Sequence, residues 1–142
     1  MGDFATAKKV LVVDDYRVIR ELLAKWLNRL GFATRTTSNG REALEAFQRD
    51  QPDLLISDVQ MPQMDGFELT RQIRAMSSIP ILIMTAGSDY MGNEKDVAFE
   101  AGADAFLMKP FELADMLGEI RLLLEGTAPI RVCMEVGEVG RS

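Results

Sequence analysis

The sequence predicts an α/β fold in which a parallel β-sheet is covered by helices on both faces. Two observations predict it: short apolar runs alternate five times with amphipathic stretches, and the runs are continuous, as in strands buried on both faces. The length of 142 residues is that of one domain. With 47% apolar and 27% charged residues, the composition is ordinary for a folded chain.

The first strand is predicted at Val10–Val13, which is short, aliphatic and rich in β-branched residues. The helix that follows is predicted over 16–30, because apolar residues recur there at spacings of three and four. We expect Asp15 to be the N-cap of this helix and Gly31 to follow its C-cap, since these residue types are favoured at those positions.

A second short strand is predicted over 33–37. Asn39 and Glu42 have the spacing of a capping box, which predicts a helix that continues to about Arg49. The third strand, 54–56, is fully apolar and leads directly into a serine and an aspartate. Three strands and two helices therefore occupy the first half of the chain.

The second half of the chain continues the same alternation. A polar loop over 86–93 separates the fourth strand from the fourth helix. The predicted segments are, in order, a helix at 67–76, a strand at 81–84, a helix at 94–101, a strand at 105–108 and a helix at 112–124.

The alternation ends after the fifth helix. We therefore expect one domain over 8–125 and a C-terminal tail or linker over 126–142. Val132, Met134 and Val136 alternate with other residues, which leaves room for a short strand. We favour the interpretation as a mobile tail or the start of a linker.

Composition excludes several kinds of function. The chain has no histidine, which excludes a Ser-His-Asp triad, a histidine zinc site and a phosphohistidine intermediate. Its net charge of −6 argues against direct nucleic-acid binding, which needs clustered lysine and arginine. A single cysteine allows no internal disulfide and fits a reducing cytoplasm. We find neither a signal peptide nor an apolar run near the ~18 residues of a membrane span, so we expect no membrane insertion.

Polar residues follow four of the five predicted strands, where open parallel sheets bind their ligands. The first strand ends in Asp14-Asp15, the third in Asp58, the fourth in Thr85 and the fifth in Lys109. Three carboxylates and one lysine leave a charge of −2, which one divalent cation would cancel. Oxygen ligands without histidine or cysteine favour Mg²⁺ or Mn²⁺.

Such a site suits phosphoryl transfer. The cation and Lys109 would neutralise charge that develops on the phosphoryl oxygens. Asp58 is the candidate nucleophile, because a carboxylate can form an acyl phosphate. Thr85 would donate a hydrogen bond to one phosphoryl oxygen. Each residue taken alone could be a turn former or a helix cap, so the prediction rests on all of them together.

These residues resemble the receiver domain of two-component response regulators, of the stand-alone, chemotaxis-regulator type. The resemblance covers about 8–125 and is carried by motifs in the right order. The most specific are Asp-x-x-Met-Pro-x-Met-Asp-Gly and Lys-Pro-Phe. The matching segments are Val10–Asp15, Leu54–Gly66, Ile81–Ala86 and Ala101–Phe111. The resemblance implies a flavodoxin-like fold, a doubly wound five-stranded parallel sheet in the order 2-1-3-4-5.

The resemblance also implies a role for each site residue. Asp58 matches the phosphoacceptor, Lys109 the phosphate-contacting lysine, Thr85 the switch hydroxyl and Phe106 the aromatic residue that changes rotamer. The implied bond between Lys109 and Pro110 is cis. The implied metal ligands are Asp14, Asp15, Asp58 and the backbone carbonyl of Gln60.

The function implied is a phosphorylation-activated switch, which catalyses only its own phosphorylation and dephosphorylation. Its phosphodonor would be a sensor histidine kinase or a phosphotransfer protein, and its output an unknown downstream protein. The resemblance leaves room for a phosphorylation-dependent homodimer. The loop over 86–93 is about two residues longer than is common in the family.

Two other functions remain to be weighed. A scaffold with the same fold would ignore phosphate, but such a protein is expected to lose an acidic or lysine position, and none is lost here. An aspartyl-phosphate hydrolase of the haloacid dehalogenase type would carry Asp-x-Asp after the first strand. This chain has Asp14-Asp15-Tyr16 instead, which disfavours a hydrolase.

Overall fold

In the computed structural model, which describes residues 7–86, 93–125 and 132–135, helices cover both faces of a parallel sheet. The strands are β1 (Lys9–Val13), β2 (Ala33–Thr37), β3 (Leu54–Asp58), β4 (Ile81–Thr85), β5 (Ala105–Met108) and β6 (Val132–Glu135). The helices are α1 (Arg17–Arg29), α2 (Gly40–Arg49), α3 (Gly66–Arg74), α4 (Glu94–Ala101) and α5 (Leu113–Leu124).

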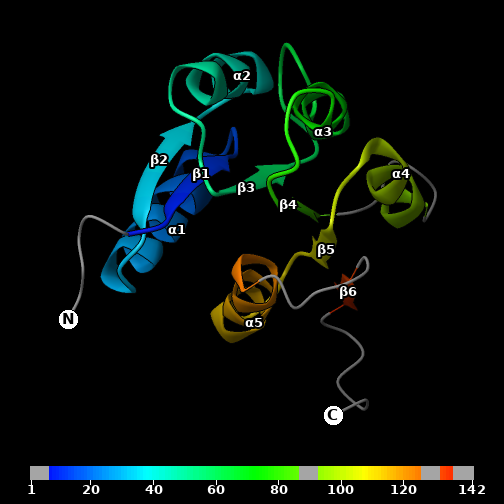
Figure 1. Cartoon of the computed structure of the whole chain (residues 1–142). Coiled ribbons are helices and arrows are strands. Elements are labelled where there is room, and N and C mark those ends of the chain that lie inside the picture. Colours follow the sequence, from blue (N-terminus) through cyan, green and yellow to red (C-terminus); the bar gives the residue numbers. More distant parts are fainter. Residues whose placement is uncertain (1–6, 87–92, 126–131, 136–142) are drawn as a thin grey trace.

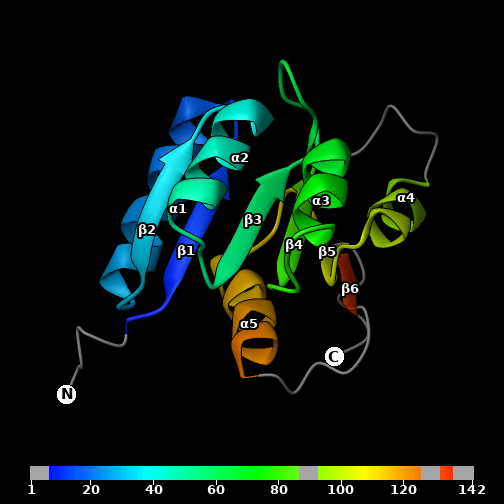
Figure 2. The ribbon, with the colours of Figure 1, turned by 45° about the horizontal axis from the view of Figure 1, so that its top comes forward.

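The strand order is β2-β1-β3-β4-β5-β6, and every neighbouring pair is parallel. The predicted order of the first five strands is therefore confirmed. Figure 2 shows the strands side by side, with β2 at one edge and β6 at the other.

Two apolar clusters hold the layers together, because successive strand residues point to opposite faces of the sheet. On one face α1 and α5 pack on the sheet, and on the other α2, α3 and α4 do (Figure 1). The strands that form these clusters are fully buried from residue 10 to 13, 54 to 58 and 81 to 85. This explains why their sequences are continuously apolar instead of alternating.

Local capping sets where most helices begin and end. Asn39 accepts a hydrogen bond from the amide of Glu42 at 2.8 Å, so the predicted N-cap of α2 is confirmed. Gly31 and Gly102 follow α1 and α4 with φ of 102° and 118°, in the left-handed region that glycine adopts most readily.

The prediction that Asp15 caps α1 is wrong. The N-cap is Tyr16, and no side chain caps it. Instead, the carboxylate of Asp14 accepts a hydrogen bond from the amide of Tyr16 at 2.9 Å. This bond turns the chain one residue before the helix, so Asp15 stays outside the helix with an exposed side chain.

The C-terminal segment contains a sixth strand, for which the sequence left room. Val132–Glu135 pairs in parallel with β5, while the C-terminal tail or linker over 126–142 stays a prediction. The alternating residues allowed this strand, and α5 supplies the crossover that a parallel pair needs. Residues 126–131 and 136–142 lie outside the described part, as do residues 87–92 of the predicted long loop.

None of the helices in the described part of the chain has the length and apolar character needed to cross a bilayer.

Candidate functional site

The carboxyl ends of the parallel strands bring the predicted polar residues to one edge of the sheet. Asp14 follows β1 directly, Asp58 ends β3, Thr85 ends β4 and Lys109 follows β5. Asp14, Asp58 and Thr85 are 0%, 8% and 2% exposed. Asp15 is exposed at the rim. The structure thus brings together the five charged or hydroxyl residues that the sequence analysis singled out.

Three carboxylates form the centre of this edge. One oxygen each from Asp14, Asp15 and Asp58 lies within 4.8 Å of the other two. The turn after β3 fits closely around Asp58, because a Cβ atom at Gly66 would overlap the carbonyl oxygen of Asp58. Only glycine therefore fits this position, and Asp65 caps α3 immediately before it. The Asp-Gly pair of the sequence motif is explained by these two contacts.

Lys109 provides the cation of the site. Its Nζ donates to Asp14 Oδ2 at 3.2 Å and lies 3.6 Å from Asp58 Oδ1. Its backbone amide donates to the carbonyl of Thr85 at 2.7 Å, which ties the ends of β4 and β5 together. The peptide bond between Lys109 and Pro110 is cis, as the resemblance implied.

The surroundings of Asp58 favour the neutral form of its carboxyl group. Burial raises its pKa to about 6, the charge of Lys109 opposes the rise, and the carboxylates of Asp14 and Asp15 add to it. Asp58 Oδ1 also accepts a hydrogen bond from the amide of Val59 at 2.9 Å. A desolvated carboxylate with two like charges beside it gains stability from any cation that reaches the cluster.

A divalent cation fits these donors. They are all carboxylate oxygens, at least one lies at the exposed rim, and their summed charge is only partly offset by Lys109. This is the donor set of a hard cation such as Mg²⁺. Gln60, expected to contribute its carbonyl, lies exposed in the loop two residues after Asp58. Its role as a ligand stays a prediction.

Phe106 lies apart from the acidic cluster. Its ring is fully buried, among the largest such side chains, and packs in the cluster between the sheet and α2, α3 and α4. It is in register with Ile83, whereas Thr85 is in register with Met108. The resemblance implied a ring that changes rotamer. In this structure the ring is buried, and the change of rotamer stays a prediction.

Sequence reasoning missed Arg20. Its Nη1 donates to the backbone carbonyl of Asp14 at 2.8 Å. The helical period could have predicted this contact. Arg20 lies four residues after Tyr16 and therefore on the same face of the helix, near the residues that connect β1 to α1.

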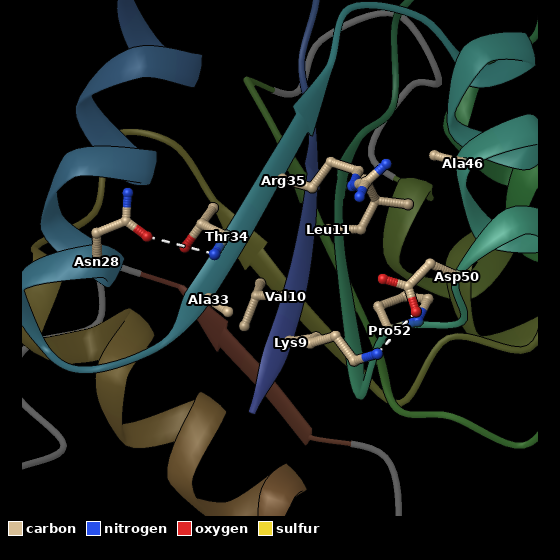
Figure 3. Close-up of a pocket in the computed structure, with 10 residues that line it drawn as sticks. All are labelled: Lys9, Val10, Leu11, Asn28, Ala33, Thr34, Arg35, Ala46, Asp50 and Pro52. Atoms are coloured by element: carbon tan, nitrogen blue, oxygen red, sulfur yellow. Dashed lines mark hydrogen bonds and ion pairs between the residues drawn. The ribbon is translucent and has the colours of Figure 1, made fainter. Parts of the chain in front are cut away.

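Hollows in the surface do not all coincide with this site. A cavity of about 380 Å³ lies where β1 and β2 begin, at the opposite end of these strands from Asp14 (Figure 3). Its charged lining includes the ion pair of Lys9 and Asp50 at 2.7 Å. A second, more apolar hollow of about 530 Å³ lies beside Lys109, between α1 and the start of α5.

Comparison with known proteins decides which family this arrangement represents. The family model of the response regulator receiver domain matches residues 10–121. The chain belongs to the response regulator receiver domain family. It is therefore a signalling domain of two-component systems, a switch activated by phosphorylation. Neither a phosphate-independent scaffold nor a hydrolase is favoured.

Relatives of this receiver domain agree with that assignment. Response regulator MprA of Mycobacterium leprae is 43% identical over 122 residues, which cover 85% of this chain and 53% of the relative. The chain thus spans about half the length of the curated relatives that it matches.

Solved structures give the same fold. Chemotaxis protein CheY4 of Vibrio cholerae matches with a TM-score of 0.77 and 35% identity, over 84% of this chain and 100% of that one. The receiver domain of sensor histidine kinase PA1611 of Pseudomonas aeruginosa has a TM-score of 0.76 and 26% identity, over 84% and 99%. That receiver holds a magnesium ion coordinated in its active site cleft.

Proposed function

We propose that Asp58 is the phosphoacceptor of this receiver domain and that Asp14, Asp15 and Asp58 bind Mg²⁺. The observation that carries this proposal is the cluster of three carboxylates beside Lys109 at the carboxyl edge of the sheet. The magnesium ion in the receiver domain of PA1611 supports the choice of cation.

The reaction follows from the chemistry of the cluster. One carboxylate oxygen of Asp58 attacks the phosphorus of a phosphohistidine or a small acyl phosphate. A P–O bond forms while the bond to the donor breaks, and the donor leaves with that electron pair. Mg²⁺, when bound, neutralises charge on the phosphoryl oxygens. Hydrolysis reverses the modification, since attack of water on phosphorus returns the Asp58 carboxylate and inorganic phosphate.

Two side chains of this edge assist the transfer. Lys109 lies 3.6 Å from Asp58, so its ammonium group can contact a phosphoryl oxygen without a large movement. Thr85, at the end of the neighbouring strand, can donate a hydrogen bond from its hydroxyl group to a second phosphoryl oxygen. We expect the catalysis to be limited to the domain's own phosphorylation and dephosphorylation.

The phosphodonor is a sensor histidine kinase or a phosphotransfer protein. The surface beside the acidic cluster suits a protein donor, because Tyr16, Val18 and Leu22 are 60%, 61% and 51% exposed. The apolar hollow next to Lys109 borders the same helix, α1. Exposed apolar side chains that gather on one surface are typical of a site that binds another protein. We expect this domain to act on a downstream protein, since the charge of −6 over these 142 residues disfavours direct nucleic-acid binding by the domain itself.

Amide NMR with beryllofluoride and Mg²⁺ tests the proposal. Beryllofluoride binds a carboxylate as a phosphoryl mimic, so we expect shift changes at Asp58, Thr85 and Lys109 that spread into the helices. The Asp58→Asn variant serves as control and is expected to show none of them. A wild-type spectrum that does not respond would contradict the proposal and favour a scaffold.

A further inference from the structure

Arg20 forms a contact with the acidic edge that the proposed chemistry does not use. This residue lies in the first turns of α1, where its amide donates to the carbonyl of Tyr16 at 3.0 Å. Its half-buried guanidinium reaches back and donates to the carbonyl oxygen of Asp14 at 2.8 Å. The bond spans six residues and joins the helix to the end of β1.

Asp14 is held through each of its polar groups. Its amide donates to the carbonyl of Thr37 at 3.2 Å. Its carboxylate accepts from the amide of Tyr16 at 2.9 Å and from Lys109 at 3.2 Å. The carbonyl is the remaining group, and Arg20 fixes it.

The orientation of this carbonyl matters for Asp15. A peptide unit is planar, so the direction of the Asp14 carbonyl also sets the direction of the Asp15 amide and the path of the chain through Asp15. Asp15 is exposed and lies before the start of α1. The bond from Arg20 therefore orients the carboxylate of the cluster that has the least support of its own.

Arg20 contacts a kind of acceptor that does not compete with a metal ion. Because it donates to a backbone carbonyl, it leaves the carboxylate oxygens available to a metal ion. Lys109, by contrast, donates to the carboxylate of Asp14 and would compete with that ion for it.

We propose that Arg20 is a positioning residue for the divalent cation, which it serves by fixing the peptide unit between Asp14 and Asp15. This inference rests on the proposed function, in which these two residues are cation ligands. Arg20 contacts neither the phosphoryl group nor the metal. Its loss should therefore weaken Mg²⁺ binding without removing the ability of Asp58 to react.

The test compares the variants Arg20→Gln and Arg20→Lys with the matched control Arg17→Gln. Arg17 lies on the same helix but forms an exposed ion pair with Glu21 at 2.9 Å. For each protein, the Mg²⁺ dissociation constant is measured by calorimetry, and labelling by acetyl phosphate is followed by intact mass over a range of Mg²⁺ concentrations.

We expect Arg20→Gln to raise the Mg²⁺ dissociation constant by about 10-fold, the usual cost of losing a group that orients a ligand. Its labelling rate should fall at low Mg²⁺ and return to the wild-type rate at saturating Mg²⁺. Arg20→Lys should be intermediate, because lysine keeps the charge but offers a more flexible donor. Arg17→Gln should match the wild type.

Two results would overturn the inference. One is an unchanged Mg²⁺ affinity in Arg20→Gln, and the other is a labelling rate that high Mg²⁺ does not restore, which would indicate a purely structural role. The Asp14→Asn variant separates this from the proposed function. If Asp14→Asn also binds Mg²⁺ normally, the assignment of the cation ligands fails together with the role of Arg20.

Discussion

The ammonium group of Lys109 lies closer to Asp14 than to Asp58. Its distance to the nearest oxygen is 3.2 Å for Asp14 and 3.6 Å for Asp58. Asp14 is fully buried, so this ion pair neutralises a carboxylate that would be costly to leave alone. Under the proposed function, a bound Mg²⁺ would take over that task and leave Lys109 available to a phosphoryl oxygen at Asp58. We therefore expect the pair to link metal binding to the reactivity of Asp58.

Asp58→Asn should abolish Mg²⁺-dependent labelling by acetyl phosphate. The amide keeps the shape of the side chain but lacks the anionic oxygen that attacks phosphorus. Intact mass spectrometry should show one phosphoryl adduct on the wild type and none on the variant. The exposed residue Asp96 lies in α4, and Asp96→Asn should be labelled like the wild type. Equal labelling of Asp58→Asn would place the phosphoacceptor elsewhere.

Replacing Asp14 or Asp15 by Asn should weaken Mg²⁺ binding, and replacing both should abolish it. Removing one carboxylate from a crowded set also relieves repulsion, so the metal-free double variant should be at least as stable as the wild type. Mg²⁺ binding is measured by calorimetric titration. Trp26 fluorescence is less suitable, because the ring packs against the apolar cluster of α1 and α5 and not at the acidic edge of the sheet. An unchanged affinity in the double variant would refute the ligand assignment.

The raised pKa of Asp58 predicts how the stability of the metal-free protein depends on pH. Its pKa is about 6 in the fold against an ordinary value of 3.8, so the folded state holds the proton more tightly. The contribution of Asp58 to the free energy of unfolding is fully present below pH 3.8, and it is lost as the pH rises toward 6. A difference of about two pKa units corresponds to about 3 kcal/mol.

Denaturant unfolding of wild type and Asp58→Asn in EDTA measures this effect. The asparagine cannot ionise, so its stability relative to the wild type should increase from pH 4 to pH 7 and then level off. Mg²⁺ should reduce the gap, because the cation stabilises the Asp58 carboxylate. A difference that stays constant between pH 4 and pH 7 would contradict the raised pKa.

The strands could be predicted from the sequence because apolar runs are local signals, and their order followed only from the resemblance that the family motifs carry. The same is true of the acidic cluster, since parallel strands deliver their last residues to one edge. Arg20 was missed for the opposite reason. Its bond to Asp14 depends on where α1 begins, and the N-cap is Tyr16 instead of the predicted Asp15.

The inward position of Phe106 and the pairing of β6 also depend on tertiary packing. Nothing in the segment around Phe106 shows which rotamer the ring adopts, because the choice depends on the space left by α3 and α4. The four residues of β6 have a weak alternation of their own. They become a strand because the edge of β5 offers unpaired backbone groups.

Removing residues 132–142 should expose the outer edge of β5. Four residue pairs join β5 to β6, so the backbone groups that they satisfy would become open to water. We expect faster hydrogen exchange at the amides of Ala105–Met108 in the truncated protein. The amides of β1, which lies between β2 and β3, should exchange as before. Unchanged protection of β5 would show that β6 adds nothing to its stability.

Thr85 is the residue through which we expect the signal to leave the site. A phosphoryl group on Asp58 offers the Thr85 hydroxyl a charge-assisted hydrogen bond of roughly 1.5–3 kcal/mol. The carbonyl of Thr85 accepts a hydrogen bond from the amide of Lys109. A movement of Thr85 should therefore also move the end of β5. Because Phe106 is already buried, we expect the signal to pass through this strand pair without an inward turn of the ring.

Thr85→Ala should therefore leave Asp58 reactive but uncouple it from the surface of α4 and α5. With beryllofluoride and Mg²⁺, amide shifts near Asp58 should persist, while those of α4, α5 and Phe106 should largely disappear. Thr85→Ser keeps the hydroxyl and should restore them. Thr36→Ala, at an exposed position of β2, should respond like the wild type and controls for loss of a strand threonine. Wild-type shift changes around Phe106 in Thr85→Ala would show that the signal leaves by another route.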